Sequence, residues 1–327
     1  MQDIVPNICS GKDRISNSGE VALYGSTGVI GRTNSASYKE NIVLVARVGA
    51  NAGQMQIGNA PCGVTDNTLV IDAKEWNYYI YYFLQHYNLN RLVFGSGQPL
   101  ITGGMLKRIK VRYGCKAERN NITRLLCLID ERIATQNKII EKLQSLIKGI
   151  RNNMMIQNQG DYIALQDIAD IYQPKTILST DLTEDGYLVY GANGIIGKYH
   201  LYNHEKEQIC ITCRGNTCGT VNYTEPKSWI TGNAMVINTD NFAENVNKRY
   251  LFHYLSSINF NSIISGSGQP QIVRQPLAKL KIILPELTIQ EHIAKCLDTI
   301  LAKIKNEQTS LQAIQIQKSY LLSQMFI

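Results

Sequence analysis

The amino-acid sequence predicts an α+β protein, in which two similar mixed α/β domains are joined by two long antiparallel coiled-coil helices with pseudo-two-fold symmetry. Three observations predict this architecture. The chain repeats itself, short β-rich runs alternate with glycine-bearing turns inside each repeat, and each repeat ends in a long apolar heptad pattern. A chain of 327 residues with 44% hydrophobic residues is also long enough to build two cores.

The internal repeat is visible as aligned segments. Residues 24–31 (YGSTGVIG) match residues 190–197 (YGANGIIG) at an offset of 166. After a five-residue insertion in the second copy, GSGQP at 95–99 matches GSGQP at 266–270 at an offset of 171. A repeat of this length indicates that each copy is one structural unit.

The domain boundaries follow from the points where the repeat passes into the heptad pattern. The stretch GDYIALQDIAD, which opens the second copy, has only a partial counterpart in the first, so we expect the first domain to lack a strand at its start. We expect a first domain at 1–113, a first long helix at 114–154, a second domain at 155–283 and a second long helix at 284–327.

Inside each domain the β-rich runs, such as 41–48 and 208–214, predict short strands. One amphipathic helix is expected before GSGQP in each copy, at 75–90 and at 243–258.

Both long helices carry one apolar stripe, whose residues step alternately by four and three positions. This is the seam of a coiled coil, and the natural partner of each helix in water is the other. An antiparallel pair would hold the two domains apart, a spacing suited to successive major grooves of duplex DNA about 34 Å apart. The seam positions are Ile122, Leu126, Ile129, Ile133, Gln136, Ile140, Leu143, Ile147, Ile150 and Met154, and Ile293, Leu297, Ile300, Ile304, Glu307, Leu311, Ile314, Lys318, Leu321 and Met325.

One polar position is shared by both seams, near the middle of each helix: Gln136 and Glu307. If the helices are antiparallel, the two side chains come close, and a polar pair in an apolar seam would fix the register. Alternatively, both side chains reach solvent and specify nothing.

Charge and cysteine usage bound the class of function. The net charge is +7, and residues 1–113 carry 11 Lys and Arg against 7 Asp and Glu, whereas residues 155–283 carry 10 against 11. This balance weakly favours a polyanionic partner. No apolar run is long enough to span a bilayer and the N-terminus does not resemble a signal peptide, so we expect a cytoplasmic protein with no membrane partner. The eight cysteines fit reduced thiols.

Three glycines recur near the start of each copy. A dinucleotide-binding loop would need a following helix and an acidic residue about twenty positions on, and these glycines lead into a strand instead. They serve a turn with positive φ, or they let the backbone approach a phosphate closely, and both interpretations stay open. The six residues are Gly25, Gly28, Gly31, Gly191, Gly194 and Gly197.

Several cations and one tyrosine near these turns are candidate DNA contacts. An arginine can bind guanine or a phosphate with two hydrogen bonds. A surface salt bridge is an equally good explanation for the presence of each of these cations. At an offset of 166, Arg47 aligns with Cys213 and Arg214 with Val48, so these two arginines are expected on opposite faces of their strands. The candidates are Arg32, Arg47, Arg91, Lys198, Tyr199, Arg214, Lys227 and Arg274.

Two further motifs favour structural interpretations. The glutamine of GSGQP could contact adenine, but its recurrence in two domains that would read different sequences favours a helix-to-strand turn. Cys210, Cys213 and Cys218, with His200 and His204, could be zinc ligands. The first copy builds the same pattern without these three cysteines, so we expect no metal.

The order of the motifs resembles one known family. In the second copy the glycine segment is followed by Arg214-Gly215, by Ser267-Gly268-Gln269-Pro270, and by a helix after Leu284-Pro285 in which Gln290 precedes Ile293. Over nearly its whole length the chain resembles the specificity subunit of type I restriction–modification enzymes. The first copy departs from the pattern, because Tyr113-Gly114 stands where the second has the leucine and proline.

The resemblance implies a non-catalytic subunit. Each of two target-recognition domains would read one half of a bipartite, gapped site on double-stranded DNA, and the two helices would set the spacer and dock two methyltransferase (modification) subunits. Restriction/motor subunits would complete this host-defence complex. The resemblance implies no cofactor in this chain, since S-adenosylmethionine, ATP and Mg would belong to the partner subunits.

Two other classes of function compete with this expectation. The alternative is a coiled-coil scaffold whose two heads bind a protein or a glycan, and a third is a hydrolase with an unrecognised site. The sequence contains no Asn/Asp-Pro-Pro-Tyr segment, no phosphate-binding Gly-Lys-Ser/Thr loop and no paired acid–lysine nuclease cluster. We therefore expect a DNA-binding protein and no enzyme.

Overall fold

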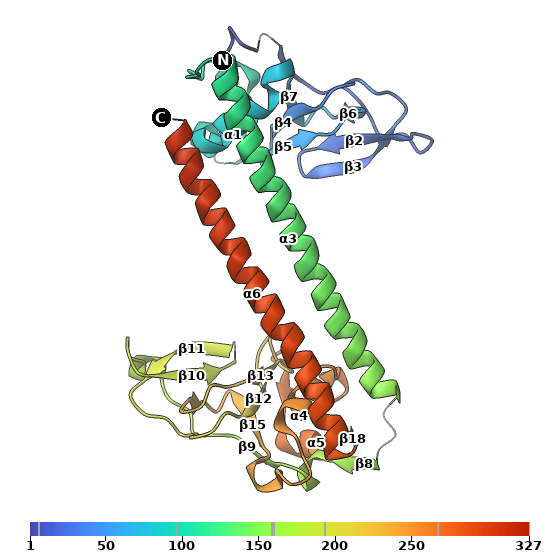
Figure 1. The fold of residues 1–327 in the computed structure, drawn as a ribbon, viewed down its shortest axis with the longest axis vertical. Helices are drawn as coiled ribbons and strands as arrows, with labels where there is room; N and C mark the ends of the chain where they lie inside the picture. Colours follow the sequence, from blue (N-terminus) through green and yellow to red (C-terminus); the bar gives the residue numbers. More distant parts are fainter. Residues whose placement is uncertain (6, 96, 158–160, 193, 267, 327) are drawn as a thin grey trace. The chain divides into compact units, whose positions relative to one another are not determined.

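The computed structural model divides the chain into two units (Figure 1). Unit 1 is Met1–Asn137 with Thr309–Ile327, and unit 2 is Lys138–Gln308. The seam side chain of Met154 and both serines of the GSGQP segments, Ser96 and Ser267, lie outside what is described. The structure describes residues 1–5, 7–95, 97–157, 161–192, 194–266 and 268–326, without the side chains of 154–157 and 161.

Unit 1 is built on a four-stranded antiparallel sheet of order β1-β7-β4-β5. Strand β4 is buried along its whole length because both faces of the sheet are covered. Val43 and Val45 face the core that includes helix α1, whereas Ile42 and Leu44 face a second core shared with Tyr24. The elements are β1 (Ile8–Ser10), β4 (Ile42–Ala46), β5 (Met55–Gly58), β7 (Thr68–Ile71) and α1 (Asn77–Tyr87).

A smaller three-stranded sheet of order β3-β2-β6 completes unit 1. Strands β2 and β3 form an antiparallel hairpin, and β6 pairs with β2 in parallel. Tyr24 on β2 is buried and its hydroxyl accepts a hydrogen bond from the backbone N–H of Asn59, which ties the hairpin to the neighbouring loop. The bounds are β2 (Val21–Gly25), β3 (Gly28–Thr33) and β6 (Cys62–Val64).

Unit 2 repeats this plan. Its sheets have the orders β13-β12-β15-β9 and β11-β10-β14, and α4 takes the place of α1. Tyr190 repeats Tyr24, since its hydroxyl accepts from the N–H of Glu225. The predicted pair of mixed α/β domains is confirmed. The elements are β9 (Asp170–Tyr172), β10 (Tyr187–Gly191), β11 (Gly194–Tyr199), β12 (Ile209–Thr212), β13 (Val221–Tyr223), β14 (Trp229–Ile230), β15 (Ala234–Asn238) and α4 (Lys248–Leu255).

The units differ at their first strand. In unit 2, β8 (Asp161–Ala164) pairs with β18 (Lys281–Leu284), and the N–H of Leu165 donates to the carbonyl of Leu280. In unit 1 the amino group of Met1 donates to the carbonyl of Ile109, which is the same bond at the equivalent position. Among the described residues of unit 1, β8 has no counterpart, as the sequence predicts.

Two long helices supply the rest of each unit: α3 (Lys116–Gln157) and α6 (Leu287–Met325). Every predicted seam position whose side chain is described is buried or half-buried, so the heptad prediction is confirmed. Within each unit the two helical segments run antiparallel (Figure 1). No helix in the described ranges is both long and apolar enough to span a bilayer.

Short elements connect these parts. They are α2 (Gly103–Lys107), α5 (Arg274–Ala278), the strands β16 (Ile264–Ser265) and β17 (Gln271–Ile272), and the 3-10 helices η1 (Lys74–Trp76), η2 (Leu89–Leu92), η3 (Leu165–Asp167), η4 (Ser179–Asp181), η5 (Asp240–Phe242) and η6 (Phe260–Ser262).

Candidate nucleic-acid interface

The glycine segment forms a tight β-hairpin in each unit. Gly25 pairs with Gly28 between β2 and β3, and Gly191 pairs with Gly194 between β10 and β11. Gly28 has φ +120° and Gly194 has φ +75°, conformations that L side chains rarely adopt. The turn itself therefore requires these two glycines.

The other four glycines make room for neighbouring side chains. Ile30 and Ile196 are β-bulge residues, since the register skips them on β3 and β11. A Cβ on Gly25 would lie 3.0 Å from the side chain of Ile30, and one on Gly191 would lie 2.9 Å from Ile196. Packing thus explains Gly25 and Gly191, while Gly31 faces Ile15 and Gly197 faces Leu182.

The outer end of this hairpin is apolar in both units. Val29 and its counterpart Ile195 are 58% and 55% exposed, and Ile30 and Ile196 are each 43% exposed. Exposed apolar side chains at a protruding turn are typical of interaction surfaces when they occur as a group.

Arg32 and Lys198 occupy equivalent places on β3 and β11, where they pair with Ala22 and Leu188. The guanidinium of Arg32 donates to the carbonyl of Glu20. The Nζ atom of Lys198 lies 3.5 Å from the fully exposed carboxylate of Asp185. An exposed pair of this kind stabilises the fold by less than about 1 kcal/mol, so both cations can exchange their partner for a ligand.

Lys198 and Tyr199 lie on β11 and Lys227 lies just before β14, and both of these strands pair with β10 in one sheet of unit 2. The ring of Tyr199 meets the ring of Trp229 edge-on at 5.1 Å. Lys227 lies two residues before Trp229 with φ +52°, and its Nζ is 3.8 Å from the Glu205 carboxylate. Three of the eight predicted contact residues therefore lie on this sheet or next to it.

Arg47 and Arg214 are not equivalent. The N–H of Arg47 donates to Asn67, and the N–H of Cys213 donates to Asn233 in the matching place, as the alignment predicts. Arg47 is half-buried and its Nη1 donates to Ser10 Oγ at 3.1 Å, whereas Arg214 is exposed. The two units therefore present different side chains at one position of the same frame.

Arg91 and Arg274 lie on other elements. The Arg91 guanidinium stands 4.9 Å above the ring of Tyr87, and Arg274 begins α5 and donates from Nε to the carbonyl of Ile171 at 2.6 Å. Arg91 also lines a cleft of about 370 Å³ in unit 1, together with Phe83, His86, Tyr87, Lys110, Arg112 and Phe326.

GSGQP is the tip of a hairpin, and the prediction of a helix-to-strand turn is wrong. Phe94 and Leu100 exchange backbone hydrogen bonds on either side of the first tip, and β16 pairs with β17 on either side of the second. Gln98 and Gln269 are both exposed at these tips. The motif letters alone contain no information about this pairing.

Cys210 and Cys213 of unit 2 are buried, and Cys218 is half-buried. Burial raises the pKa of the Cys210 thiol to about 12 and also raises the pKa of Cys213. His204 is buried, and its Nε2 lies 2.9 Å from the hydroxyl of Tyr172. Within the described ranges, no three His, Cys, Asp or Glu side chains are placed to hold a metal ion.

Gln136 and Glu307 each lie in their own unit. Gln136 is 9% exposed on α3 of unit 1, and Glu307 on α6 of unit 2 is paired with Lys303 one turn earlier. Their role in setting the register stays a prediction.

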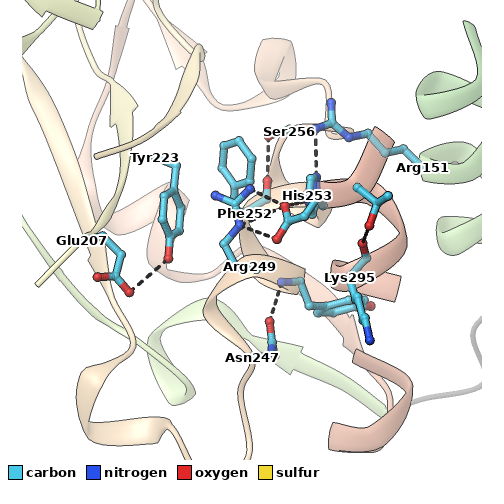
Figure 2. A network of polar contacts seen from close by, with 12 residues as sticks. Arg151, Glu207, Tyr223, Asn247, Arg249, Phe252, His253, Ser256 and Lys295 are labelled. Atoms are coloured by element: carbon cyan, nitrogen blue, oxygen red, sulfur yellow. Dashed lines mark hydrogen bonds and ion pairs between the residues drawn. The ribbon is translucent and has the colours of Figure 1, made fainter. Parts of the chain in front are cut away.

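A buried polar network in unit 2 joins the domain to the long helices, and nothing in the sequence analysis predicts it (Figure 2). His253 on α4 is fully buried, its Nε2 lies 2.8 Å from Asp298 on α6, and its Nδ1 lies 3.1 Å from Arg151 on α3. Arg249, one turn before His253, also binds the Asp298 carboxylate through two nitrogens. The network thus connects three helices.

The geometry fixes the protonation of His253. A guanidinium can only donate, so Nδ1 must accept from Arg151 and the proton resides on Nε2, which donates to Asp298. The pKa of His253 is lowered to about 4, chiefly by burial; Asp298 raises it, and the charges of Arg151 and Arg249 lower it. The imidazole is therefore neutral at physiological pH.

Unit 1 has a matching network with other residues. Tyr82 is the residue of unit 1 that corresponds to His253 at the offset of 171. Its hydroxyl donates to Asp130 on α3 at 2.9 Å. Asp130 in turn is paired with Lys318 on α6 at 2.6 Å. A polar side chain inside the apolar stripe of both amphipathic helices is the sequence signal that would have revealed both networks.

Comparisons with known proteins agree with the repeated architecture. The family model for the type I restriction modification DNA specificity domain matches twice, at residues 8–153 and 161–315. A crystal structure of the S subunit of a type I restriction–modification system from M. genitalium has a TM-score of 0.78 with 18% identity, covering 98% of this chain and 93% of that one.

Three specificity subunits are similar in sequence. A putative type I subunit of Haemophilus influenzae is 29% identical over 150 residues, which are 44% of this chain and 38% of that protein. The EcoprrI subunit of Escherichia coli is 31% identical over 34% of this chain and 27% of its own length. The MjaVIII subunit of Methanocaldococcus jannaschii is 23% identical over 86% of this chain and 76% of its own length.

The first two of these relatives are therefore matched over well under half of their length, whereas the family model covers nearly all of this chain in two successive copies. Each copy coincides with one heptad-tailed repeat of the sequence. The chain belongs to the family of type I restriction modification DNA specificity domains, and it contains two of them.

Proposed function

We propose that this chain is the DNA-specificity subunit of a type I restriction–modification complex. The observation that carries the proposal is a pair of specificity domains with one common frame and different surfaces. Arg32 is replaced by Lys198, and Val48 by Arg214, at equivalent positions. Two readers that share a backbone but differ in exposed side chains suit a site with two different halves.

In this proposal residues 1–113 and 155–283 are the target-recognition domains. Residues 114–154 and 284–327 set the distance between the half-sites and dock two modification subunits, to which restriction/motor subunits are added. S-adenosylmethionine, ATP and Mg act in those partners, in the cytoplasm. The antiparallel packing of α3 and α6 within each unit supports the role of the helices, and the family match favours this function over the scaffold alternative.

The predicted contact residues divide by role. Arg32, Lys198 and Lys227 have only exposed partners, so we assign them to phosphates, where they add affinity at every sequence. Arg214 is exposed beside the second hairpin tip and is our first choice for a base contact. Arg47 is half-buried on Ser10 and has the weaker claim.

The test is co-expression of the chain with the modification subunit of its own operon, followed by sequencing of the methylated bases. We expect one bipartite motif with a fixed gap. In the same assay, Arg214→Ala should relax or abolish one half of the motif and leave the other half unchanged, because Arg214 belongs to one domain. Lys198→Ala is the matched control and should lower methylation without changing the motif. A methylome without a gapped bipartite motif would contradict the proposed function.

A further inference from the structure

We propose that the two GSGQP tips are the sequence-independent grip of the protein on DNA, each binding the sugar–phosphate backbone beside its own half-site. The inference rests on the proposed function. The described residues of the tips are 95 and 97–99 in unit 1 and 266 and 268–270 in unit 2, and the five letters of the segment are identical in both copies. The fold itself requires some of these five residues and leaves the others free.

The first glycine of each tip has a structural explanation, and the backbone carbonyl of the proline attaches the tip to a neighbouring turn. Gly95 has φ +102° and Gly266 has φ +91°, and a Cβ on either would lie within 2.7 Å of a backbone carbonyl oxygen. The carbonyl of Pro99 accepts from the N–H of Gly49 at 2.9 Å, and the carbonyl of Pro270 accepts from Gly215 at 3.0 Å. These bonds attach the hairpin to the end of β4 or β12.

The second glycine and the glutamine have no such explanation. Gly97 and Gly268 have open space around the position of a Cβ and no positive φ. Gln98 and Gln269 are exposed, and neither side chain makes a hydrogen bond to another described residue. The free chain would therefore tolerate other residues at these four positions at little cost in stability.

Neighbouring exposed positions show that the surface around the tips has diverged. Phe94 corresponds to Ser265, and Arg91 corresponds to Ser262. Identity at positions that the fold leaves unconstrained, surrounded by positions that differ, indicates a partner that presents the same surface to both units. The bases of two different half-sites cannot be that surface, whereas the phosphates of the duplex can.

The chemistry of the tips also fits a phosphate. A glycine without a side chain lets the backbone N–H groups approach an oxyanion closely, and a glutamine amide donates to phosphate oxygens without reading the base. No Asp or Glu occurs at 88–103 or at 257–275, and Arg214 is bridged to Gln271 at the base of the second tip. A carboxylate on a partner protein would satisfy the glutamine as well, so the experiment separates the two.

The experiment uses the full chain in complex with its modification subunit and two duplexes, one with the methylated motif and one without. Gln98→Ala and Gln269→Ala should each weaken binding about tenfold for both duplexes, since one hydrogen bond to a charged group is worth about 1.5 kcal/mol. The ratio between the two duplexes should stay constant. Gln269→Glu, which has the same shape, should weaken binding further by repelling the phosphate. Ser262→Ala is the matched exposed control and should change nothing.

The outcomes are distinct. A loss confined to the motif-bearing duplex would identify base reading and overturn the inference. So would unchanged DNA affinity, or a loss of the modification subunit from Gln269→Glu complexes in size-exclusion chromatography, which would identify a protein contact. Gly268→Val should retain the melting temperature while it weakens DNA binding. If the unaltered complex selects no bipartite site, the proposed function fails; if it does and the tip variants bind normally, only this inference fails.

Discussion

Each unit attaches its short helix, α1 in unit 1 and α4 in unit 2, to segments of the long helices α3 and α6, and the two units do so with different chemistry. Unit 1 uses a neutral phenol, Tyr82, against the Asp130–Lys318 ion pair. Unit 2 uses a fully buried imidazole, His253, between Asp298 and Arg151. The difference teaches that the fold requires a hydrogen-bonded partner for the polar side chain of the short helix at this point, because an orphaned buried group would be costly, and that the identity of the groups is free to change.

The largest expected difference between the units is their response to acid. His253 has a pKa of about 4 in the fold against 6.5 unfolded, so between these values the unfolded chain binds the proton more readily. Unit 2 is then expected to lose on the order of 3 kcal/mol as the pH falls from about 6.5 to 4, whereas Tyr82 does not titrate there. The single tryptophans, Trp76 in unit 1 and Trp229 in unit 2, report each unit separately in urea unfolding.

His253→Gln is the control for that experiment, because an amide also donates once and accepts once but does not titrate. The Trp229 transition of this variant should be much less dependent on pH between 6.5 and 4. An equal loss of stability in the variant and the natural chain would show that another group is responsible.

The start of each long helix gives the next comparison. Gln290 is fully buried; its Nε2 donates to the carbonyls of Asn245 and Pro285, and its Oε1 accepts from Asn247. Arg119, at the equivalent place in unit 1, stacks on Trp76 at 3.6 Å and donates to the carbonyl of Gly114.

Gln290→Ala should therefore destabilise unit 2 by about 2 kcal/mol, since it leaves buried backbone groups without partners. Arg119→Ala should destabilise unit 1 by about 1 kcal/mol, the contribution of a half-buried cation–π contact. Urea midpoints from the two tryptophans measure both. Equal losses would mean that the two helix starts are equally buried in solution.

A smaller effect is expected at the ion pair of unit 1. Lys318→Met removes the charge that faces Asp130 but keeps a side chain of similar length. The Asp130 carboxylate still accepts the hydrogen bond from the Tyr82 hydroxyl, and its side chain is 35% exposed to water. We expect a loss of about 1 kcal/mol in the Trp76 transition and none in the Trp229 transition. Arg132→Met, at an exposed position of α3 in unit 1, is the control. A loss above about 3 kcal/mol would indicate that Asp130 is cut off from solvent.

The smallest effect on stability is expected at the matched cations of the hairpins. Arg32→Ala and Lys198→Ala should each change the free energy of unfolding by less than about 0.5 kcal/mol, because their partners are the carbonyl of the exposed residue Glu20 and an exposed carboxylate. Both should reduce the salt dependence of DNA binding by about one counterion. An unchanged salt slope in both variants would remove these residues from the phosphate contacts.

The sequence predicted the features that repeat with a period and missed those that depend on pairing across the chain. Heptad spacing located every seam position whose side chain is described. The offset of 166 correctly made Arg47 of the first copy equivalent to Cys213 of the second. The GSGQP letters predict a helix-to-strand turn and the structure has a hairpin tip, because nothing local shows that Phe94 pairs with Leu100. His253 and Asp298 are 45 residues apart, and only folding brings them together.

The division of the chain between the units sets an order for their synthesis. Unit 2 is one continuous stretch, whereas unit 1 is completed by residues 309–327, which bring Leu322, Met325 and Phe326 to its core and Lys318 to Asp130. On the ribosome the unit that is made first must therefore wait for the last turns of α6. Until then α1 and the first half of α3 expose the apolar surface that α6 covers, so a growing chain matures from its second half.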